Sequence, residues 1–548
     1  MAKSDLRIDI LGTVFTISTD EDPEYLNMLL DKYRRTIENV QRVSGLKDPL
    51  KTAILTGFLL CDDLEKAGGG ESPAQSSGEE GGEAEKLTLG MISRLDEALM
   101  APDAPREEGD TIPEAAIQEA GAGIFRLKNP VKNYDWGSPE WIPALVGERN
   151  LSRIPWAELW MGVNPSGPSR VISGEDESGK VQDAPLLSEL IDRKKETFLG
   201  KGIAGTYGTL PFLFKVLAAA RPLSIQVHPN QKQAREGFHR ENRAGIPLDA
   251  PNRNYKNPTH KPEIICALSP FAALCGFRTV PEIIDLFEIL SRRSGGPLKA
   301  GLENLVSALK RENENPYKAF LTALFGLGRE ERAALGPFIR THVSPLERDF
   351  PGYRDEWELC SYLAGLYPGD PGIIAPLYLN IVELAEGEAM YLPAGVFHSY
   401  IHGMGIELMA DSDNVLRGGL TPKYVDPREL LEILTFSAYR PEILKAPSPP
   451  PPWFSYPSPA EEFALSVISC SGSSVPYPET GPSIVIVTQG DAAISEPGSG
   501  NEITISKGES VFISAGKNRN LVFSGTFTAY AAAAGRITGE QIPARQMP

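Results

Sequence analysis

The sequence lacks long apolar runs, paired cysteine motifs and any excess of basic residues, and each absence excludes a class of protein. No stretch approaches the ~20 apolar residues of a transmembrane helix. The first residues carry no apolar signal region, so we expect a cytoplasmic protein with no membrane partner. The five cysteines are scattered and odd in number, which favours free thiols in a reducing compartment over a disulfide framework.

Two further absences concern ligands. The formal net charge of −18 argues against a nucleic-acid partner or a general membrane-surface role. The sequence contains neither a Walker loop nor a dinucleotide-binding fingerprint, which argues against an ATP or NAD enzyme. At 548 residues the chain exceeds one comfortable hydrophobic core, so two or more domains are expected.

The first predicted domain spans residues 5–67 and has a ββαα pattern. Alternating apolar residues on either side of Gly12 predict a β-hairpin. Asp22-Pro23 and Asp48-Pro49 each predict a helix start, because Asp caps the first turn and Pro suits its first position. Two strands and two helices bury too little apolar surface alone, so we expect this domain to form a homodimer.

The rest of the chain divides by composition and periodicity. Residues 68–123 are rich in Gly, Pro and Ser and carry a net charge of −10, which is typical of a flexible linker. Short strands with Gly and Pro turns are expected over 124–278 and 367–445. Between them, apolar i, i+3, i+4 spacing over 279–366 predicts a helical insertion. Residues 446–548 are expected to form a Pro-rich connector and a second small antiparallel barrel.

A set of possible metal ligands recurs on the predicted strands. The alternating run LSIQVH places Gln226 and His228 on one face. Glu263 opens a second apolar run, and His398 lies far downstream on a third. A divalent metal of borderline softness accepts amide, imidazole and carboxylate donors. Satisfied polar residues in a β-core are the alternative, and His402 is a rival ligand because it alternates onto the His398 face.

The motifs QVHPN, THKPE, AGVFHSY and SDNVLRGGLTPKYVD occur in this order and together resemble type I mannose-6-phosphate isomerases, which are zinc-dependent cupin enzymes. YDWGS, AELWMG and LPFLFKVL support the likeness, which runs from about residue 125 to the C-terminus. The resemblance implies a mainly β fold of cupin-type antiparallel barrels with a helical insertion. It also implies one Zn²⁺ per chain, held by Gln226, His228, Glu263 and His398. The ligand set alone also admits manganese, iron or cobalt.

Aldose–ketose isomerisation of a phosphorylated hexose needs a metal or other electrophile and a cationic grip on the substrate. Arg417 and Lys423 are the predicted cations, since Arg offers a rigid fork and Lys a point charge. Similarity to the family implies roles for both in binding transition-state charge and phosphate. The alternative is that both are solvated surface charges.

The reaction also needs a base near the carbon acid. Lys261, His260 and Asp413 are the three candidates from the sequence, and spacing does not choose among them. Asp413 has an alternative as a turn residue bonded to its own backbone. Tyr400 is a candidate for a hydrogen bond to substrate, with burial in the core as the other possibility.

The N-terminal segments IDILGTVFTISTDEDPEYL and DPLKTAILTGFLLCDDLEKA resemble the ZapA family of bacterial cell-division proteins. The resemblance implies a head that dimerises and binds the tubulin-like division protein. The long coiled-coil helix of that family is interrupted here by AGGGESPAQSSGEEGGEAE. A dimerisation module without a division role is the alternative.

The combined prediction is a metal-dependent isomerase that interconverts mannose 6-phosphate and fructose 6-phosphate through an enediol, with a small ββαα head and an acidic linker. Two alternatives are kept. One is an isomerase or epimerase for another sugar phosphate on the same scaffold, because fold does not fix function. The other is a non-catalytic sugar-phosphate-sensing adaptor linked to the division filament.

Overall fold

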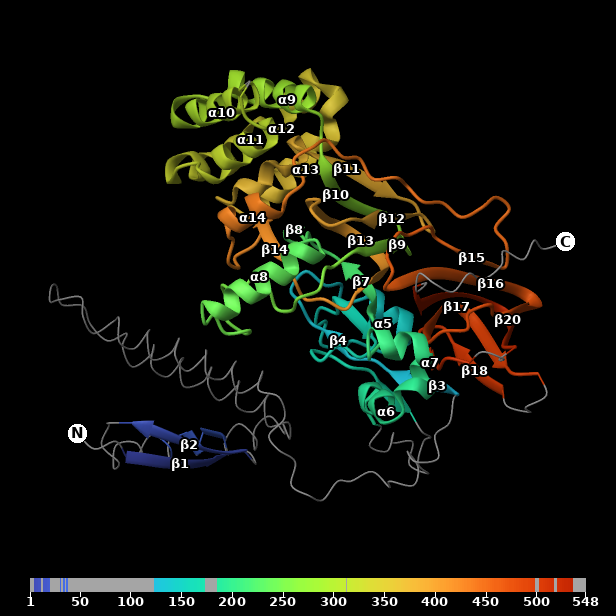
Figure 1. The fold of residues 1–548 in the computed structure, drawn as a ribbon. Coiled ribbons are helices and arrows are strands. Elements are labelled where there is room, and N and C mark those ends of the chain that lie inside the picture. Colours follow the sequence, from blue (N-terminus) through green and yellow to red (C-terminus); the bar gives the residue numbers. More distant parts are fainter. Residues whose placement is uncertain are drawn as a thin grey trace. The chain divides into compact units, whose positions relative to one another are not determined.

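The computed structural model describes residues 4–10, 13–19, 30, 33–34, 36–37, 123–172, 185–311, 313–497, 502–516 and 520–535 (Figure 1). The chain divides into two units, Met1–Asp110 and Thr111–Pro548, and each is described by itself. No helix among the described residues is long and apolar enough to cross a membrane.

The first unit contains the predicted hairpin. Strands β1 (Ser4–Ile10) and β2 (Thr13–Thr19) pair antiparallel, with a register that runs from Ser4↔Thr19 to Ile10↔Thr13. The described residues of the first predicted helix are helical. The second predicted helix and the linker up to residue 122 lie outside the described residues.

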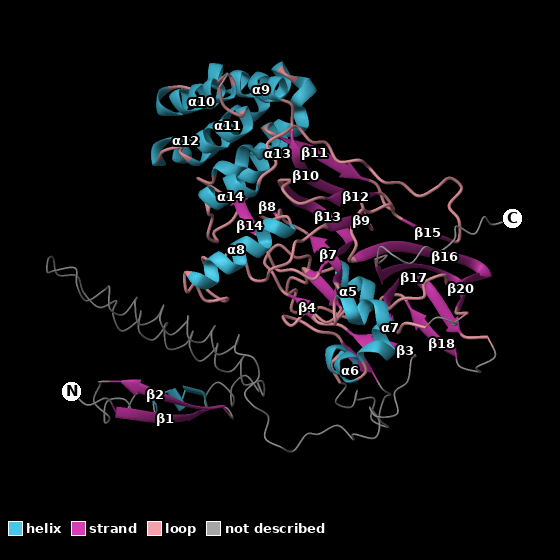
Figure 2. Ribbon diagram, in the orientation of Figure 1, coloured by secondary structure: helices cyan, strands magenta, loops and turns pink. Residues whose placement is uncertain are grey.

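The second unit is built on two antiparallel sheets (Figure 2). The first sheet has ten strands, in the main order β11-β10-β13-β7-β5-β4, with β8, β9, β12 and β14 paired beside this path. Its strands are β4 (Val131–Lys132), β5 (Glu158–Met161), β7 (Phe212–Ala219), β8 (Ile225–Val227), β9 (Glu263–Ala267), β10 (Phe271–Phe277), β11 (Leu379–Leu384), β12 (Ala389–Leu392), β13 (His398–Ala410) and β14 (Leu416–Gly419).

Strand β13 organises this first sheet. Its first half pairs with β10 and β8, and its second half, from Gly403, pairs with β7 and β9. Gly403 has φ 128°, and a Cβ there would lie 2.7 Å from the ring of Phe271, so only glycine fits where the strand changes partners. The change of partners brings residues from four strands around one long strand.

The second sheet has eight strands in the order β15-β16-β20-β17-β19-β3-β6, with β18 paired to β17. They are β3 (Ile124–Lys128), β6 (Arg170–Ile172), β15 (Trp453–Ser455), β16 (Phe463–Pro476), β17 (Ser483–Ser495), β18 (Glu502–Ser506), β19 (Ser510–Ile513) and β20 (Val522–Ala534). We had expected all of 124–278 to belong with the metal-bearing strands. Instead β3 pairs with β19, far along the chain, because partner choice depends on tertiary contacts that local alternation does not encode.

Helices α9–α13 confirm the helices predicted for the insertion, and they gather together beyond β10 and β11 (Figure 1). They are α9 (Val280–Arg293), α10 (Gly296–Leu309), α11 (Pro316–Phe325), α12 (Arg329–Asp349) and α13 (Arg354–Leu366), with short 3-10 turns η1 (Pro351–Tyr353) and η2 (Pro371–Leu377). The other helices are α5 (Trp141–Val146), α6 (Leu187–Arg193), α7 (Lys195–Thr206), α8 (Gln231–Arg243) and α14 (Pro427–Ile433).

The three largest apolar clusters among the described residues hold the second unit together. One joins the insertion helices to strands β8, β10 and β14. Another packs the first sheet against the second, and a third fills the interior of the second sheet. Each fully buried Leu, Ile or Phe contributes about 1.5–3 kcal/mol, so these clusters provide the rigid frame on which polar residues can be held.

Candidate metal centre and active site

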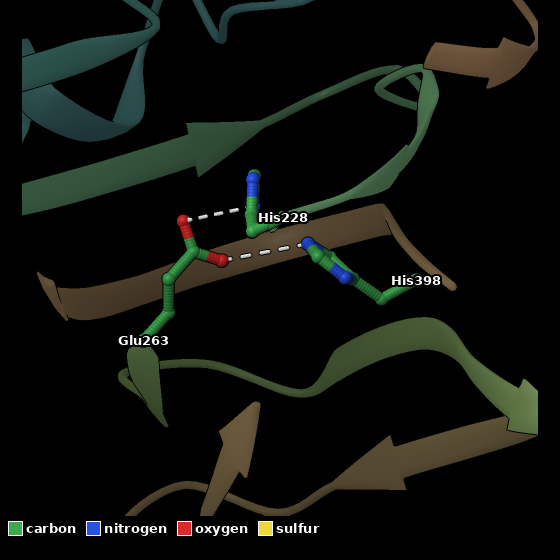
Figure 3. A group of neighbouring side chains, drawn as sticks. All are labelled: His228, Glu263 and His398. Carbon is green, nitrogen blue, oxygen red and sulfur yellow. Dashed lines mark ion pairs between the residues drawn. The ribbon is translucent and has the colours of Figure 1, made fainter. Parts of the chain in front are cut away.

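Three side chains that are distant in sequence meet in the interior of the first sheet (Figure 3). His228 Nε2 lies 3.3 Å from one oxygen of Glu263, and His398 Nε2 lies 3.4 Å from the other. Their exposed fractions are 3%, 2% and 3% for His228, Glu263 and His398. The candidate ligand atoms all lie within 4.8 Å of one another, so one metal ion can reach all three.

The sheet register explains the meeting. His228 follows the last residue of β8, Glu263 begins β9, and His398 begins β13. Gln226, the fourth predicted ligand, is directly opposite His398 in the β13–β8 pair. Side chains opposite each other on antiparallel strands have Cβ atoms ~4.5–5.5 Å apart, so the structure brings Gln226 beside the group.

The hydrogen bonds of the two histidines leave both Nε2 atoms available. Nδ1 of His228 lies 2.8 Å from the carbonyl oxygen of Asn414, and Nδ1 of His398 lies 3.0 Å from that of Val396. A carbonyl oxygen only accepts, so each Nδ1 donates its proton and each ring turns Nε2 toward Glu263. Nε2 of His228 is buried without a hydrogen-bond partner. Two Nε2 atoms facing a carboxylate fit a divalent cation between them.

The electrostatics agree with this assignment. Burial, followed by the positive charge of Lys261, lowers the pKa of His228 to about 4, so its ring is neutral at pH 7. Burial alone would oppose ionisation of Glu263. The charge of Lys261, whose Nζ is 2.7 Å from the carboxylate, and the neighbouring histidine outweigh it and hold the pKa of Glu263 well below its usual range. The site therefore presents the neutral imidazole of His228 beside an ionised carboxylate.

A second buried ionic group, which we did not predict, lies on neighbouring strands. Lys215 Nζ is 2.9 Å from Glu407 and 3.4 Å from Glu158, and all three side chains are buried. Trp160 donates its indole N–H to Glu158 over 2.7 Å. Burial by itself would lower the pKa of Lys215, but the two carboxylates raise it above its usual value, so Lys215 stays charged.

The sequence carried a signal for this group. Lys215 interrupts the otherwise apolar strand FLFKVLAA, and Glu407 and Glu158 stand in the similarly apolar runs GIELMA and AELWMG. A charge inside a buried strand needs a partner. That these three are each other's partners follows only from the order β5-β7-β13.

Of the predicted bases, Lys261 and His260 point to different places. Lys261 contacts Glu263, whereas the ring of His260 lies 2.6 Å from Glu462, just ahead of β16. Alternation along the extended chain puts neighbouring side chains on opposite faces. The structure thus brings Lys261 to the candidate metal group. It places His260 against Glu462, in the segment that leads into β16 of the second sheet.

Asp413, the third predicted base, is partly buried in the segment between β13 and β14. Its charge acts on Lys132 and Tyr134. Its neighbour Asp411 accepts a hydrogen bond of 2.7 Å from Asn164, and burial raises the pKa of Asp411 to about 6. Asp413 is therefore close to other charged groups but has no role that the structure assigns by contact.

The two predicted cations lie on one segment. Arg417 is partly buried on β14, opposite Gln226, and burial lowers its pKa. Partial burial of the ammonium group lowers the pKa of Lys423. The positive charges of Arg417 and Lys256 lower it further. The charge of Asp135 opposes this shift without cancelling it, and like charges gathered in this way are typical of a site for an anion.

Tyr400 and His402 show how β13 divides. Tyr400 is buried, with its ring centroid 5.3 Å from that of Phe271 and 6.0 Å from that of His398, and its hydroxyl has no hydrogen-bond partner. This packing matches the core alternative, and its contact with substrate stays a prediction. His402, the rival ligand, is exposed with its ring edge against Trp141, apart from the candidate metal group.

A further residue that sequence reasoning missed holds the motifs in place. The buried Asn414 side chain accepts the backbone N–H groups of Lys256 and Asn257 over 2.7 and 3.2 Å. Its amide nitrogen donates to the carbonyl oxygens of Asn257 and Thr259 over 2.7 and 2.9 Å. All four of its hydrogen-bonding positions are used. Asn414 thus ties the SDN motif to the loop that leads into THKPE.

The first antiparallel sheet encloses a cluster of two histidines and a carboxylate. A buried lysine contacts the cluster, and further cations lie on the neighbouring strand and turn. These features together define a metal-dependent enzyme with a site for an anionic substrate. Comparison with known proteins makes the class specific. The family described as "Phosphomannose isomerase type I, catalytic domain" matches residues 124–280, and "Cell division protein ZapA" matches residues 6–99.

Relatives from distant organisms match most of the second unit. Mannose-6-phosphate isomerase of Escherichia coli strain K12 is 37% identical over 395 residues, covering 72% of this chain and 95% of the relative. Mannose-6-phosphate isomerase 2 of Arabidopsis thaliana is 34% identical over 432 residues, covering 76% and 94%. The human enzyme is 31% identical over 422 residues, covering 73% and 96%.

Solved structures agree. A zinc-bound crystal structure of mannose 6-phosphate isomerase has a TM-score of 0.67 at 32% identity, covering 76% of this chain and 100% of its own. The Salmonella typhimurium enzyme bound to substrate (f6p) and zinc matches with a TM-score of 0.67 at 33% identity and the same coverage. The chain belongs to the type I mannose-6-phosphate isomerase family, with a ZapA-like segment at its N-terminus.

Proposed function

We propose that this protein interconverts mannose 6-phosphate and fructose 6-phosphate. The buried group of His228, Glu263 and His398, with both histidine Nε2 atoms turned toward the carboxylate, is the observation that carries the proposal. The substrates named for its relatives fit the anion site suggested by Arg417 and Lys423.

The residues that would hold zinc are His228, Glu263 and His398, with Gln226 as the fourth ligand. When bound, the metal would orient the sugar and polarise its oxygens. The hydrogen bonds from Nδ1 to backbone carbonyls keep both rings in the tautomer that offers Nε2. Burial of all three side chains excludes water from the donor atoms.

Proton transfer is the work of the chain's own side chains. Isomerisation removes the proton from C2 of the aldose and protonates the carbonyl oxygen O1, which gives an enediol; a proton then returns to C1 as the O2 hydroxyl loses its own. Of the three predicted bases, we assign the transfer to Lys261 Nζ, because it is the candidate in contact with Glu263. To act as a base, Lys261 must offer an unprotonated Nζ to C2 of the sugar.

Binding of the substrate's negative charge is assigned to the segment from β14 to Lys423. Arg417 is proposed to stabilise the charge that develops on the enediol oxygens, and Lys423 to bind the phosphate. Asp413 and His260 keep supporting roles in this proposal, Asp413 near Lys132 and Tyr134 and His260 on Glu462. Tyr400 is proposed to pack behind His398, where its hydroxyl can face substrate only after a side-chain movement.

The proposed fold is a pair of cupin-type barrels. The antiparallel order of both sheets and the change of partners in β13 support closure of each sheet. The proposed divisions are a head (5–67), a linker (68–123), a metal-binding barrel in two parts (124–278 and 367–445) around the helical insertion (279–366), and a C-terminal barrel (446–548), whose sheet is completed by β3 and β6 from the first of these parts.

The head is proposed to form a homodimer, since a two-stranded hairpin with helices needs a partner to bury its apolar face. The ZapA match supports this, and a division-protein partner is a further expectation from the same match. Deletion of residues 5–67 should give a monomer with full isomerase activity by light scattering and assay. A dimeric deletion variant would contradict the account.

A cytoplasmic location is proposed because Cys266, Cys275, Cys360 and Cys470 are free thiols.

Turnover of mannose 6-phosphate by the purified full-length protein tests the main proposal. Chelation should abolish activity and zinc should restore it. His398→Ala should lower kcat/KM by about 10³-fold or more, because the metal supplies several kcal/mol of transition-state stabilisation. His342→Ala, which changes a histidine on α12 stacked on Phe338, is the matched control and should keep wild-type activity. A folded, zinc-loaded wild-type protein without turnover would refute the proposal.

A further inference from the structure

The two substrate-binding cations proposed above lie at either end of an unusual turn. Arg417 is on β14 and Lys423 is six residues later. Between them Leu420 has φ 55°, in the left-handed region that a residue with a Cβ rarely adopts, and Leu420 is 1% exposed. A strained backbone of this kind persists only where its surroundings hold it.

Asp370, between α13 and η2, holds this turn. One carboxylate oxygen accepts the N–H of Gly372 over 2.7 Å and so caps η2. The other accepts the N–H of Thr421 over 3.2 Å, in the turn itself. Burial raises the pKa of Asp370, and the backbone N–H groups of Gly372, Thr421 and Leu420 oppose the rise. Each oxygen therefore serves a different segment.

The two segments also touch backbone to backbone. A Cβ on Gly419 would lie 3.0 Å from an Asp370 oxygen and 3.2 Å from the Cα of Gly372, and Gly419 has φ 147°. A Cβ on Gly372 would lie 3.0 Å from the nitrogen of Leu420. Such close approach leaves the turn little freedom to move away from Asp370.

The contact is passed on to Lys423. The hydroxyl of Thr421 accepts the backbone N–H of Lys423 over 3.1 Å, so the residue anchored by Asp370 in turn fixes the backbone of the predicted phosphate-binding lysine. At the other end, Arg417 is held opposite Gln226 in the β14–β8 pair. The separation of the two cations thus depends on the turn between them.

We propose that Asp370 is a positioning residue that sets the separation of Arg417 and Lys423 and thereby the affinity for the substrate's phosphate. The inference rests on the proposed function, because it takes the anion held by this segment to be the phosphate of the hexose. The segment that follows the helical insertion thus takes part in substrate binding through the turn that it holds. Asp370 itself does not touch the substrate.

Asp370→Asn is the selective test. An asparagine keeps one accepting oxygen, which can cap Gly372, but its amide nitrogen cannot accept the N–H of Thr421. The variant should keep η2 and lose the anchor of the turn. Asp370→Ala loses both. Asn315→Ala is the matched control, because Asn315 caps α11 in the insertion by accepting from Tyr317 and Lys318 and has no contact with the turn.

The measurements are the dissociation constant of fructose 6-phosphate by calorimetry, KM and kcat for mannose 6-phosphate, zinc content and melting temperature, all on zinc-loaded full-length protein. Both Asp370 variants should raise the dissociation constant and KM roughly 10- to 100-fold, as expected when a binding group is displaced by about 1 Å. Zinc content should not change, and kcat should fall less than KM rises. Asn315→Ala should lower the melting temperature without changing either binding constant.

Unchanged affinity in folded, zinc-loaded Asp370→Asn would overturn the inference and leave Asp370 as a cap of η2 alone, with the proposed function intact. If the wild type binds no fructose 6-phosphate, the inference fails as well. Absence of mannose 6-phosphate turnover in the wild type is a different result, because it refutes the proposed function. If Asp370→Ala does not fold, Asp370→Asn decides.

Discussion

The two sheets of the second unit have the same antiparallel architecture but different interiors. The first sheet and its connecting loops bury acidic and basic side chains, among them Glu158, Lys215, His228, Lys261, Glu263, His398 and Glu407. Within the described strands of the second sheet, the buried polar residues are all hydroxyls, namely Ser466, Ser483, Thr488 and Ser510. The location of buried charge, not the fold, separates the catalytic sheet from the other one.

The difference has an energetic basis. A buried charge costs free energy that only close partners offset, whereas a buried hydroxyl needs one modest hydrogen bond. In the first sheet the charges are paired, as Lys215 is with Glu407. In the second sheet Tyr477 donates to Ser483 over 2.9 Å. A sheet that needs only stability can use hydroxyls and apolar packing, so ionic groups in the first sheet indicate chemistry.

The largest expected effect on stability comes from breaking the ionic group of the first sheet. Lys215→Met leaves Glu158 and Glu407 buried without their cation and should lower the free energy of unfolding by about 3–5 kcal/mol. Urea denaturation measures this. Adding Glu158→Gln and Glu407→Gln to Lys215→Met should recover much of the loss, since no buried charge is then unpaired. Wild-type stability in the single variant would show that the two sheets do not differ in this way.

An intermediate effect, which depends on pH, is expected at Asp411. Burial raises its pKa to about 6 from 3.8, so the folded carboxyl binds a proton more readily than the unfolded one. Its stabilising contribution is complete below pH ~4 and is lost as the pH rises through about 6. Asp411→Asn stays neutral and should be more stable than wild type by about 2 kcal/mol at pH 8.

Thermal unfolding of wild type and Asp411→Asn across pH 4–8 tests this, and the gap between the two should close toward pH ~4. Ser483→Ala in the second sheet is the control, because a hydroxyl does not titrate and its effect should be independent of pH. A gap at Asp411 that stays constant with pH would contradict the assignment.

The smallest effect is expected in the second sheet. Tyr477→Phe removes the buried hydrogen bond to Ser483 and should lower the free energy of unfolding by about 1 kcal/mol. Because no ionic group is involved, kcat and KM should equal the wild-type values in the steady-state assay. A loss of activity in this variant would mean that the second sheet contributes to catalysis after all.

Local pattern was enough for several elements. The hairpin of β1 and β2 and the helices α9–α13 follow from periods of 2 and 3.6 residues and from turn and cap residues, which act over a few positions. The start of α11 shows the mechanism, since Asn315 accepts two N–H groups of the first turn. The candidate metal ligands were predicted because ordered motifs resemble a family.

Other features could not be reached in this way. Three findings depend on contacts between residues far apart in sequence. Strand β3 pairs with β19, and Lys215 pairs with Glu407. His260 turns to Glu462 and not to the candidate metal group. Alternation gives the face of a strand but not its neighbour. A predicted role for His260 beside Glu263 therefore had no local evidence against it.

The sequence by itself determined the order of strands and helices, the acidic linker and the donor types of the candidate metal site, because these depend on composition and on spacing of a few residues. Only the tertiary structure decided which donors meet, which cations share a turn and which lysine is locked between carboxylates. The physical reason is that β13 pairs with strands from four other parts of the chain, and a distance between side chains exists only once those partners are chosen.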